Sequence, residues 1–184
     1  MRLKARGAVR IALVVGMAIV SLSGSSAFAE APTALEPFAF LVGEWQASGS
    51  GEPGAGSGTS VFTREVQDRV ILRRSYAEYP PAAGKPGSRH DDLMIIYSRS
   101  SGSARADYYD NEGHVIRYDV MSPTAGQAVF VSEAAAGEPR FRLSYHLEAS
   151  GVLRGEFAIA PPSAPDAFKP YLTWESRKPL EVAK

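Results

Sequence analysis

Three histidines are the residues of this 184-residue chain best suited to acid–base or metal chemistry. They are His90, which precedes two aspartates, His114 and His146. Imidazole binds zinc and transfers protons near neutral pH, but no two of these histidines have the sequence spacing of metal ligands. A metal site assembled across strands is one interpretation and three solvated histidines are the other. We favour the second and expect no bound metal.

A catalytic role for His114 would need a partner to activate. The residue follows Glu112 at the start of an expected strand, where it could act as a general base. The chain has no cysteine and no Gly-x-Ser-x-Gly sequence, so the commonest activated nucleophiles are missing. The sequence therefore names no catalytic residue and gives no support to an enzyme.

Tyrosines and one arginine are the better candidates for a site. Tyrosine combines an apolar ring with a polar tip, and small-molecule cavities are mostly apolar with a few polar groups. In the run from Val70 to Tyr76, apolar and basic residues fall on both faces of an expected strand, so one of two adjacent arginines must point inward. An inward arginine indicates an amphipathic or anionic ligand. The candidate contacts inside the protein are Arg73, Arg74, Tyr76, Tyr97, Tyr145 and Tyr171.

Short strands separated by turn residues must position these side chains. Val, Ile, Tyr and Phe alternate with polar residues, most clearly from Phe141 to Leu147, where the odd-numbered residues share the apolar face. Tight turns such as Asn111–Gly113 predict antiparallel neighbours. We predict strands at 43–49, 59–66, 69–79, 92–99, 103–110, 114–121, 126–133, 139–148, 152–160 and 168–177.

Ten strands in up-and-down order predict a closed antiparallel β-barrel, because closure removes exposed strand edges. The Gly-rich run 49–58 predicts a hairpin loop. Two Pro-rich connectors, 80–88 and 161–165, are either the rim of a barrel mouth or plain surface insertions. A short helical turn from Ala34 to Leu41 precedes the first strand, and Trp45 then plugs one end of the barrel.

The N-terminus has the pattern of a secretory signal peptide. Four basic residues precede an apolar run, and Ala27-Phe28-Ala29 follows as a cleavage site, so we expect residues 1–29 to be removed and 30–184 to form one barrel domain. The apolar run is too short for a membrane anchor. We expect a periplasmic or secreted protein.

The remaining chain keeps 16 basic residues against 20 acidic ones, which argues against nucleic acid as a partner. It has no disulfide framework, because the sequence contains no cysteine. A protein partner is not predictable from these features.

Gly43-Glu44-Trp45 at the first strand and Arg177 at the end of the last resemble the calycin superfamily, in which an N-terminal Gly-x-Trp packs under an arginine. Within that group, the chain looks most like an uncharacterised family of bacterial secreted lipocalin-like domains. The stretch from Tyr108 to Ile116 is the most distinctive part of the likeness. The resemblance implies that Arg177 lies on the indole of Trp45 and closes the barrel through a cation–π contact.

A more distant resemblance is to nitrobindins, which are haem-binding ten-stranded barrels. Their opening pattern Leu-Leu-Gly-x-Trp-x-Gly-x-Gly fits only partly from Leu41 onward. Their iron-binding histidine, in a Pro-x-x-His-Leu-like stretch, is replaced here by tyrosine in Lys169-Pro170-Tyr171-Leu172. Tyrosine can bind ferric haem, so the resemblance weakens a haem cofactor without removing it.

The sequence thus predicts an all-β, up-and-down antiparallel barrel of about ten strands, lipocalin-like, exported, and without a cofactor. Its predicted function is to bind a small apolar or amphipathic ligand in the lumen without transforming it. Two alternatives stay open. One is a haem-binding, nitrobindin-like barrel with redox or peroxide chemistry, and the other is an envelope scaffold whose outer face binds another protein.

Overall fold

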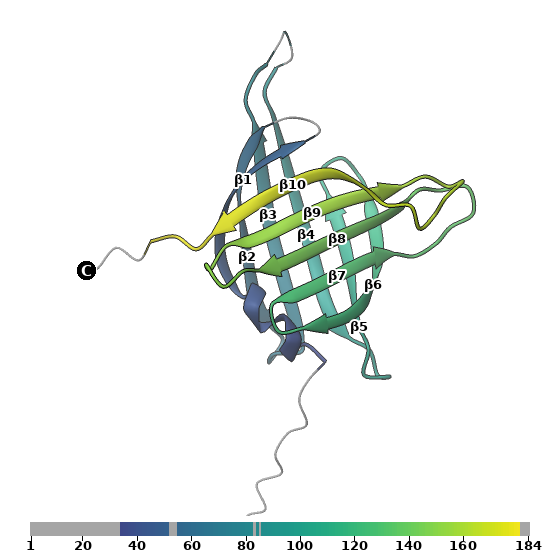
Figure 1. Ribbon diagram of the computed structural model, residues 1–184. Coiled ribbons are helices and arrows are strands. Elements are labelled where there is room, and N and C mark those ends of the chain that lie inside the picture. The colour runs from purple at the N-terminus through teal and green to yellow at the C-terminus, as the bar shows by residue number, and fades with distance from the viewer. Residues whose placement is uncertain (1–33, 52–54, 83, 85, 181–184) are drawn as a thin grey trace, which may run out of the picture. The chain divides into compact units, whose positions relative to one another are not determined.

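The computed structural model describes residues 34–51, 55–82, 84 and 86–180. The predicted signal peptide, 1–29, lies outside these residues. One short 3-10 helix precedes ten strands (Figure 1). The elements are η1 (Glu36–Leu41), β1 (Gly43–Gly51), β2 (Gly56–Glu65), β3 (Val70–Tyr79), β4 (Ser88–Ser98), β5 (Ala104–Asp110), β6 (Val115–Thr124), β7 (Gln127–Ser132), β8 (Arg140–Leu147), β9 (Leu153–Ala160) and β10 (Lys169–Arg177).

The ten strands form a closed antiparallel barrel in sequence order, as the turn spacing predicted. Each strand pairs with its neighbours along the chain, and β1 closes the ring on β10 through pairs from Gln46↔Arg177 to Gly51↔Leu172. The Gly-rich run is a β1–β2 hairpin, with Gly49 opposite Gly56. Three strands extend clearly beyond their predicted bounds: β2 begins already at Gly56, β6 ends only at Thr124, and β4 begins at Ser88 because the β3–β4 ladder continues to Tyr79↔Ser88.

One end of the barrel is closed by η1 and the apolar side chains beneath it. Leu35, Phe38 and Leu41 are fully buried, and the Phe38 ring stacks on Phe130 of β7 with 5.9 Å between centroids. Trp45, at the start of β1, is 2% exposed. Burying these large side chains supplies the stabilisation that a disulfide-free domain needs. This end is called the closed end below.

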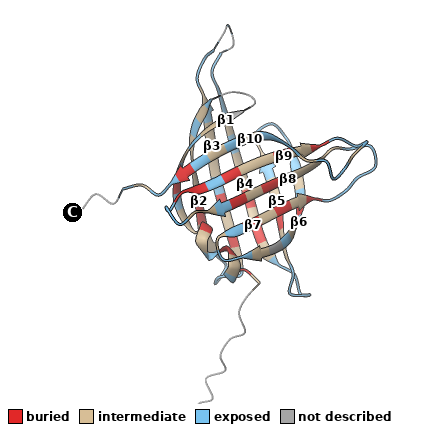
Figure 2. Ribbon diagram, in the orientation of Figure 1, coloured by how far each residue is buried: buried red, intermediate tan, exposed pale blue. Residues whose placement is uncertain are grey.

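The inner wall is fully packed in the half next to the closed end. Figure 2 shows buried positions recurring across successive strands there. The wall alternates with outward residues along each strand, as the pleat requires. Its buried members are Trp45, Phe62, Ile71, Met94, Ile96, Ala106, Tyr118, Phe130, Leu143, Tyr145 and Leu153.

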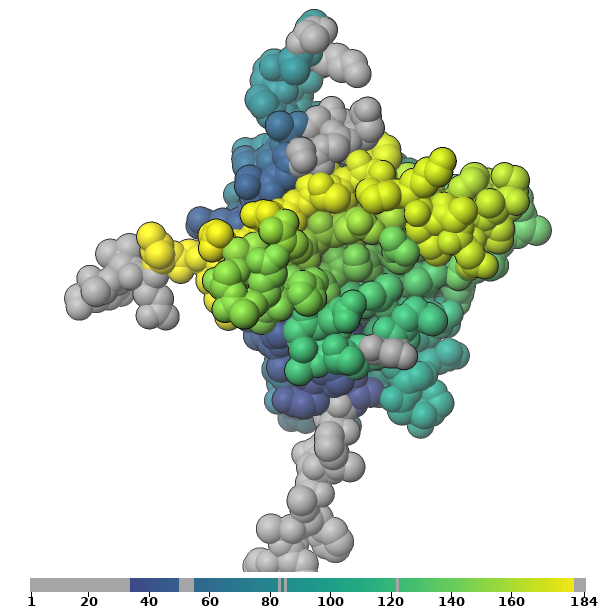
Figure 3. All heavy atoms as spheres, viewed as in Figure 1, coloured from purple at the N-terminus to yellow at the C-terminus, as the bar shows by residue number. Residues whose placement is uncertain are grey.

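The two Pro-rich connectors both join strands at the end opposite η1, but they behave differently. The connection from Pro80 to Gly87 extends the β3–β4 hairpin. The β9–β10 connection instead packs on outward side chains of β8. Arg140 Nη1 lies 2.6 Å from Asp166 Oδ1, and Phe168 lies under the guanidinium groups of Arg140 and Arg142 at 5.8 and 4.9 Å. Figure 3 shows this yellow-green connection as a bulge beside the strands. It is therefore held against the outer wall.

Among the described residues, no helix is long and apolar enough to cross a membrane.

Candidate functional site

The inner wall becomes solvent-accessible in the half of the barrel away from η1. On β3, Ile71 is fully buried and Arg73 is 5% exposed, whereas Ser75 and Ala77, further along the same face, are half-buried. The same change occurs at the same level on the neighbouring strands. We call this part of the wall the open half. Its half-buried inward positions are Ala47, Gly49, Gly56, Gly58, Ser60, Ser75, Ala77, Tyr79, His90, Asp92, Tyr108, Asp110, Ile116, Phe141, Phe157, Ile159, Leu172 and Trp174.

Small residues line one side of the open half. Between the level of Trp45 and Phe62 and the rim, the inward positions of β1, β2 and β3 are glycine, alanine or serine, up to Tyr79 at the end of β3. The hydroxyls of Ser60 and Ser75, 2.9 Å apart, add polar groups there. Below Tyr79, these strands therefore leave the open half without the large side chains that fill the closed half.

Aromatic rings line the adjoining side, on β8, β9 and β10, where β10 pairs with β1. Phe141 stacks on Phe157 at 5.7 Å between centroids, and Phe157 meets Tyr171 edge-on at 6.4 Å. Trp174 packs edge-on against Tyr145 at 5.9 Å. These rings form an apolar wall of the kind that binds small molecules.

Arg73 forms the floor between the two halves. Its Nη2 lies 2.5 Å from Asp92 Oδ1, its Nη1 donates to the hydroxyl of Tyr145, and its guanidinium lies 5.7 Å from the centre of the Tyr108 ring. Burial is the largest single influence and opposes its charge, but Asp92, Tyr145 and Tyr108 together outweigh burial and raise the pKa of Arg73 above its usual value. Arg73 Nε is buried and has no hydrogen-bond partner among the described residues. One polar hydrogen at the floor is therefore left to donate.

A chain of hydrogen bonds runs from this floor to the rim. The hydroxyl of Tyr108 lies 2.9 Å from His90 Nε2, and His90 Nδ1 lies 3.0 Å from Glu112 Oε1 at the rim. Tyr108 also donates to Asp110 Oδ2 at 3.3 Å. Asp110 in turn accepts from the backbone N–H groups of Glu112 and His114 and lies 2.9 Å from His114 Nδ1.

The tyrosines of this network are neutral hydrogen-bonding groups. Burial, followed by the charge of Asp92, raises the pKa of Tyr108 well above its ordinary value. Burial likewise raises the pKa of Tyr145 and of Tyr118. A phenol with a raised pKa is a poor nucleophile and a poor base at neutral pH. The arrangement is thus suited to orienting a bound molecule.

The structure brings only some of the predicted site residues together. Arg73 is the inward member of the arginine pair, and Tyr145 and Trp45 are also inside, while Tyr171 lies exposed at the rim. The other candidates face outward. Arg74 is exposed; Tyr76 lies under Arg89, 4.1 Å from its guanidinium; and the Tyr97 hydroxyl is 3.4 Å from Asp107 Oδ2.

The predicted contact between Arg177 and Trp45 is wrong. Lys178 Nζ lies 5.2 Å from the centre of the Trp45 ring, and Arg177 is exposed. The physical reason is strand alternation. Trp174 and Ser176 face inward on β10, so the next inward position is Lys178, and Arg177 points to the other side.

Inner-wall residues of the site that were missed from the sequence include His90, Asp92, Asp110 and Trp174. His90 and Asp92 alternate on one face of β4, but the predicted strand began only at residue 92. His146 is exposed on the outer face, as its alternation predicted. In the part of the chain that the structure describes, no group of three or more His, Asp or Glu side chains is arranged to hold a metal ion.

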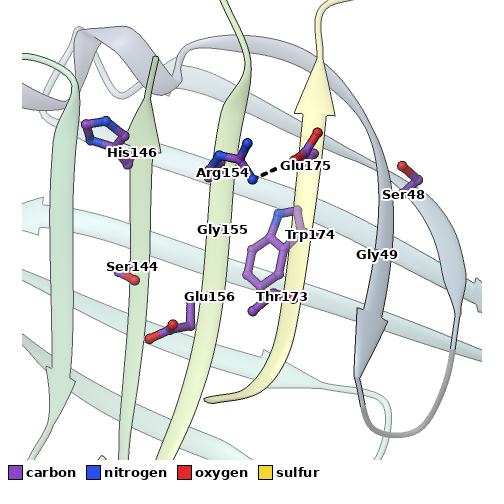
Figure 4. A pocket seen from close by; sticks show the side chains of 10 residues that line it. All are labelled: Ser48, Gly49, Ser144, His146, Arg154, Gly155, Glu156, Thr173, Trp174 and Glu175. Carbon is purple, nitrogen blue, oxygen red and sulfur yellow. Dashed lines mark ion pairs between the residues drawn. The ribbon is translucent and has the colours of Figure 1, made fainter. Parts of the chain in front are cut away.

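A depression of about 600 Å³ lies on the outer face of β8, β9, β10 and β1 (Figure 4). Two of its charged lining residues pair with each other, with Arg154 Nη1 2.5 Å from Glu175 Oε1, and a third, Glu156, pairs at 2.9 Å with Nη2 of the neighbouring Arg142. These charged side chains already have partners. The open half is therefore the stronger candidate site.

No family model matches the chain, and no curated protein matches it. Among solved structures, the chain is similar to one described as a de novo design of a fluorescence-activating β-barrel. The two chains share 11% sequence identity at a TM-score of 0.39, over 76% of this chain and 94% of the designed one.

Proposed function

We propose that this protein binds a small, partly apolar molecule in the open half of the barrel and does not transform it. One observation carries the proposal: inward side chains change from fully buried to solvent-accessible at one level around the barrel. A barrel packed only for stability would bury its inner wall throughout, because every exposed apolar ring forfeits burial energy.

The composition of the open half supports a binding role. Its aromatic wall offers apolar contact area, and the adjoining small-residue wall leaves room beside it. The floor adds a few fixed polar groups, including the unpartnered Arg73 Nε. Apolar walls with a small number of placed polar groups are typical of small-molecule sites.

The proposal also includes export of the protein and its resemblance to lipocalin-like domains. The signal-peptide pattern supports a periplasmic or secreted protein cleaved after Ala29, and N-terminal sequencing of the exported protein would test this. The lipocalin-like resemblance rests on Gly43-Glu44-Trp45 and the stretch from Tyr108 to Ile116. A Soret band in the purified protein would instead favour the haem alternative.

Binding can be tested with N-phenyl-1-naphthylamine, a neutral apolar probe whose fluorescence rises on leaving water. We expect saturable binding to the chain from Glu30 onward. Ala77→Trp, which fills the open half, should weaken binding by at least about tenfold because the probe and the indole would compete for one space. Ser48→Trp adds the same side chain to the outer face and should leave binding unchanged. Absent binding, or equal binding by both variants, would overturn the proposal.

A further inference from the structure

The charges inside the open half do not balance. Its inward charged side chains, among the described residues, are one cation, Arg73, and two carboxylates, Asp92 and Asp110, with His90 between floor and rim. At the rim, exposed Lys169 and Glu112 are solvated and of opposite sign. A molecule that enters past the rim therefore meets an excess of one negative charge when His90 and His114, which lies 2.9 Å from Asp110, are both neutral.

Arg73, the single cation, already has partners for its two terminal nitrogens. Arg73 is 5% exposed, and its two terminal nitrogens contact Asp92 Oδ1 and the Tyr145 hydroxyl. Its remaining Nε–H has no partner among the described residues, but it is itself buried. An anionic group placed beside it would also lie close to the Asp92 carboxylate, and this repulsion offsets the attraction of Arg73.

The negative field reaches other groups of the open half. Burial comes first in raising the pKa of Tyr108, and the charge of Asp92 comes next. At Tyr79, on the far end of β3, burial and Tyr171 come first, and the charges of Glu112 and Asp92 then raise the pKa further. Asp110 stays ionised because hydrogen bonds from His114 and Glu112 outweigh its burial and lower its pKa.

We infer that the open half selects an apolar molecule carrying a cationic head group, such as an amine or a quaternary ammonium. This inference rests on the proposed function and names its ligand class. It revises the expectation of an anionic ligand, which depended on an inward arginine with an unused charge. The half-buried faces of Trp174 and Phe157 fit the same class, because aromatic rings attract cations.

Three surfactants with the same decyl chain provide the test: decyltrimethylammonium, decyl maltoside and decyl sulfate, each below its micellar concentration. Displacement of N-phenyl-1-naphthylamine reports their affinities. We expect the cation to bind at least roughly tenfold more tightly than the anion, because a net negative charge in the open half attracts the first head group and repels the second. Equal affinities, or tighter binding of decyl sulfate, would overturn the inference but leave luminal binding standing. If the probe itself does not bind, both the inference and the proposed function fail.

A charge-neutralising variant sharpens the test. Asp92→Asn keeps an oxygen for Arg73 and removes one negative charge, so the preference should fall by roughly tenfold or reverse toward the sulfate. Glu175→Gln, on the outer face beside Arg154, is the matched control and should keep the wild-type preference. Should Asp92→Asn not give a wild-type circular dichroism spectrum, Asp110→Asn makes the same charge change. An unaltered preference in the folded variant would contradict the inference.

Discussion

Trp45 Nε1 donates a 2.7 Å hydrogen bond to the carbonyl oxygen of Leu41. Leu41 is the last residue of η1, where carbonyl groups lack partners within the helix. The indole therefore fills the closed end and also satisfies a buried polar atom of the segment that covers it. The side chain of Trp45, four residues after Leu41, thus joins η1 to the barrel.

Trp45→Ala should lower the free energy of unfolding by about 3–5 kcal/mol, because it leaves a cavity and an unpaired carbonyl. Trp45→Phe keeps a ring but loses the hydrogen bond, so we expect a smaller loss of about 1–3 kcal/mol. Urea unfolding followed by far-ultraviolet circular dichroism measures both. A loss within about 0.5 kcal/mol for the alanine variant would mean that the indole is not buried.

Lys178 and Arg177 offer a direct comparison of two adjacent cations. Because Lys178 is exposed and 5.2 Å from the indole centre, Lys178→Ala should cost about 0.5–1 kcal/mol. Arg177→Ala should change stability by less than about 0.5 kcal/mol. Urea unfolding of both variants, in the same buffer, decides the matter; a larger loss for Arg177→Ala would restore the contact that the family resemblance implied.

Strand alternation explains which features could be predicted from the sequence. From Phe141 to Leu147 one face is apolar and the other polar, so both the strand and its inward residues were predictable. On β10 the same alternation pairs Trp174 with Lys178, so the sequence did contain the signal for the barrel-closing lysine. The choice of Arg177 followed the family pattern instead.

On β3 and β4, the residues that face inward could not be predicted in this way. Leu72 and Ile95 face outward and are half-buried, while Arg73 and Asp92 face inward. Polarity therefore does not separate the two faces, and Tyr97 was placed inside. Only the register of the β3–β4 hairpin shows that Asp92 compensates the charge of Arg73.

The Arg73–Asp92 pair should stabilise the fold only as a pair. Arg73→Met leaves a buried carboxylate without its partner and should cost about 3–5 kcal/mol. The double variant Arg73→Met with Asp92→Leu should cost much less than the sum of the two single variants, because neither charge then remains. A double-mutant cycle by urea unfolding measures the coupling. Additive losses would show that the two side chains do not interact.

Asp110 should contribute stability that depends on pH. Burial opposes its ionisation, but hydrogen bonds from His114 and Glu112 hold its folded-state pKa below the ordinary value. Its contribution is therefore present above the unfolded pKa of about 4 and is lost as pH falls through the folded pKa. Asp110→Asn should thus be less stable than wild type at neutral pH, and the difference should shrink in acid.

Urea midpoints at neutral and acidic pH test this prediction. Asp166→Asn, a substitution at an exposed carboxylate with a side chain 86% accessible, serves as the control. A constant difference between Asp110→Asn and wild type across pH would mean that the hydrogen bonds do not favour the ionised form.

Gly155 leaves the space that the Trp174 indole occupies on the inner face of the barrel. A Cβ atom at position 155 would overlap Cε2 and Cζ2 of Trp174, and the indole edge also packs against Tyr145. Gly155→Ala should therefore displace the ring and cost about 1–3 kcal/mol by overpacking. The near-ultraviolet circular dichroism of the indole should change with it.

The Trp174→Ala background separates steric conflict from a loss of backbone freedom. With the indole removed, the space is free, and adding Gly155→Ala should cost less than about 0.5 kcal/mol or stabilise the barrel, because alanine has fewer unfolded conformations than glycine. Urea unfolding of the four proteins completes the cycle. If Gly155→Ala cost the same with and without the indole, the ring would not lie on Gly155, and the aromatic wall of the open half would have to be redrawn on β9 and β10.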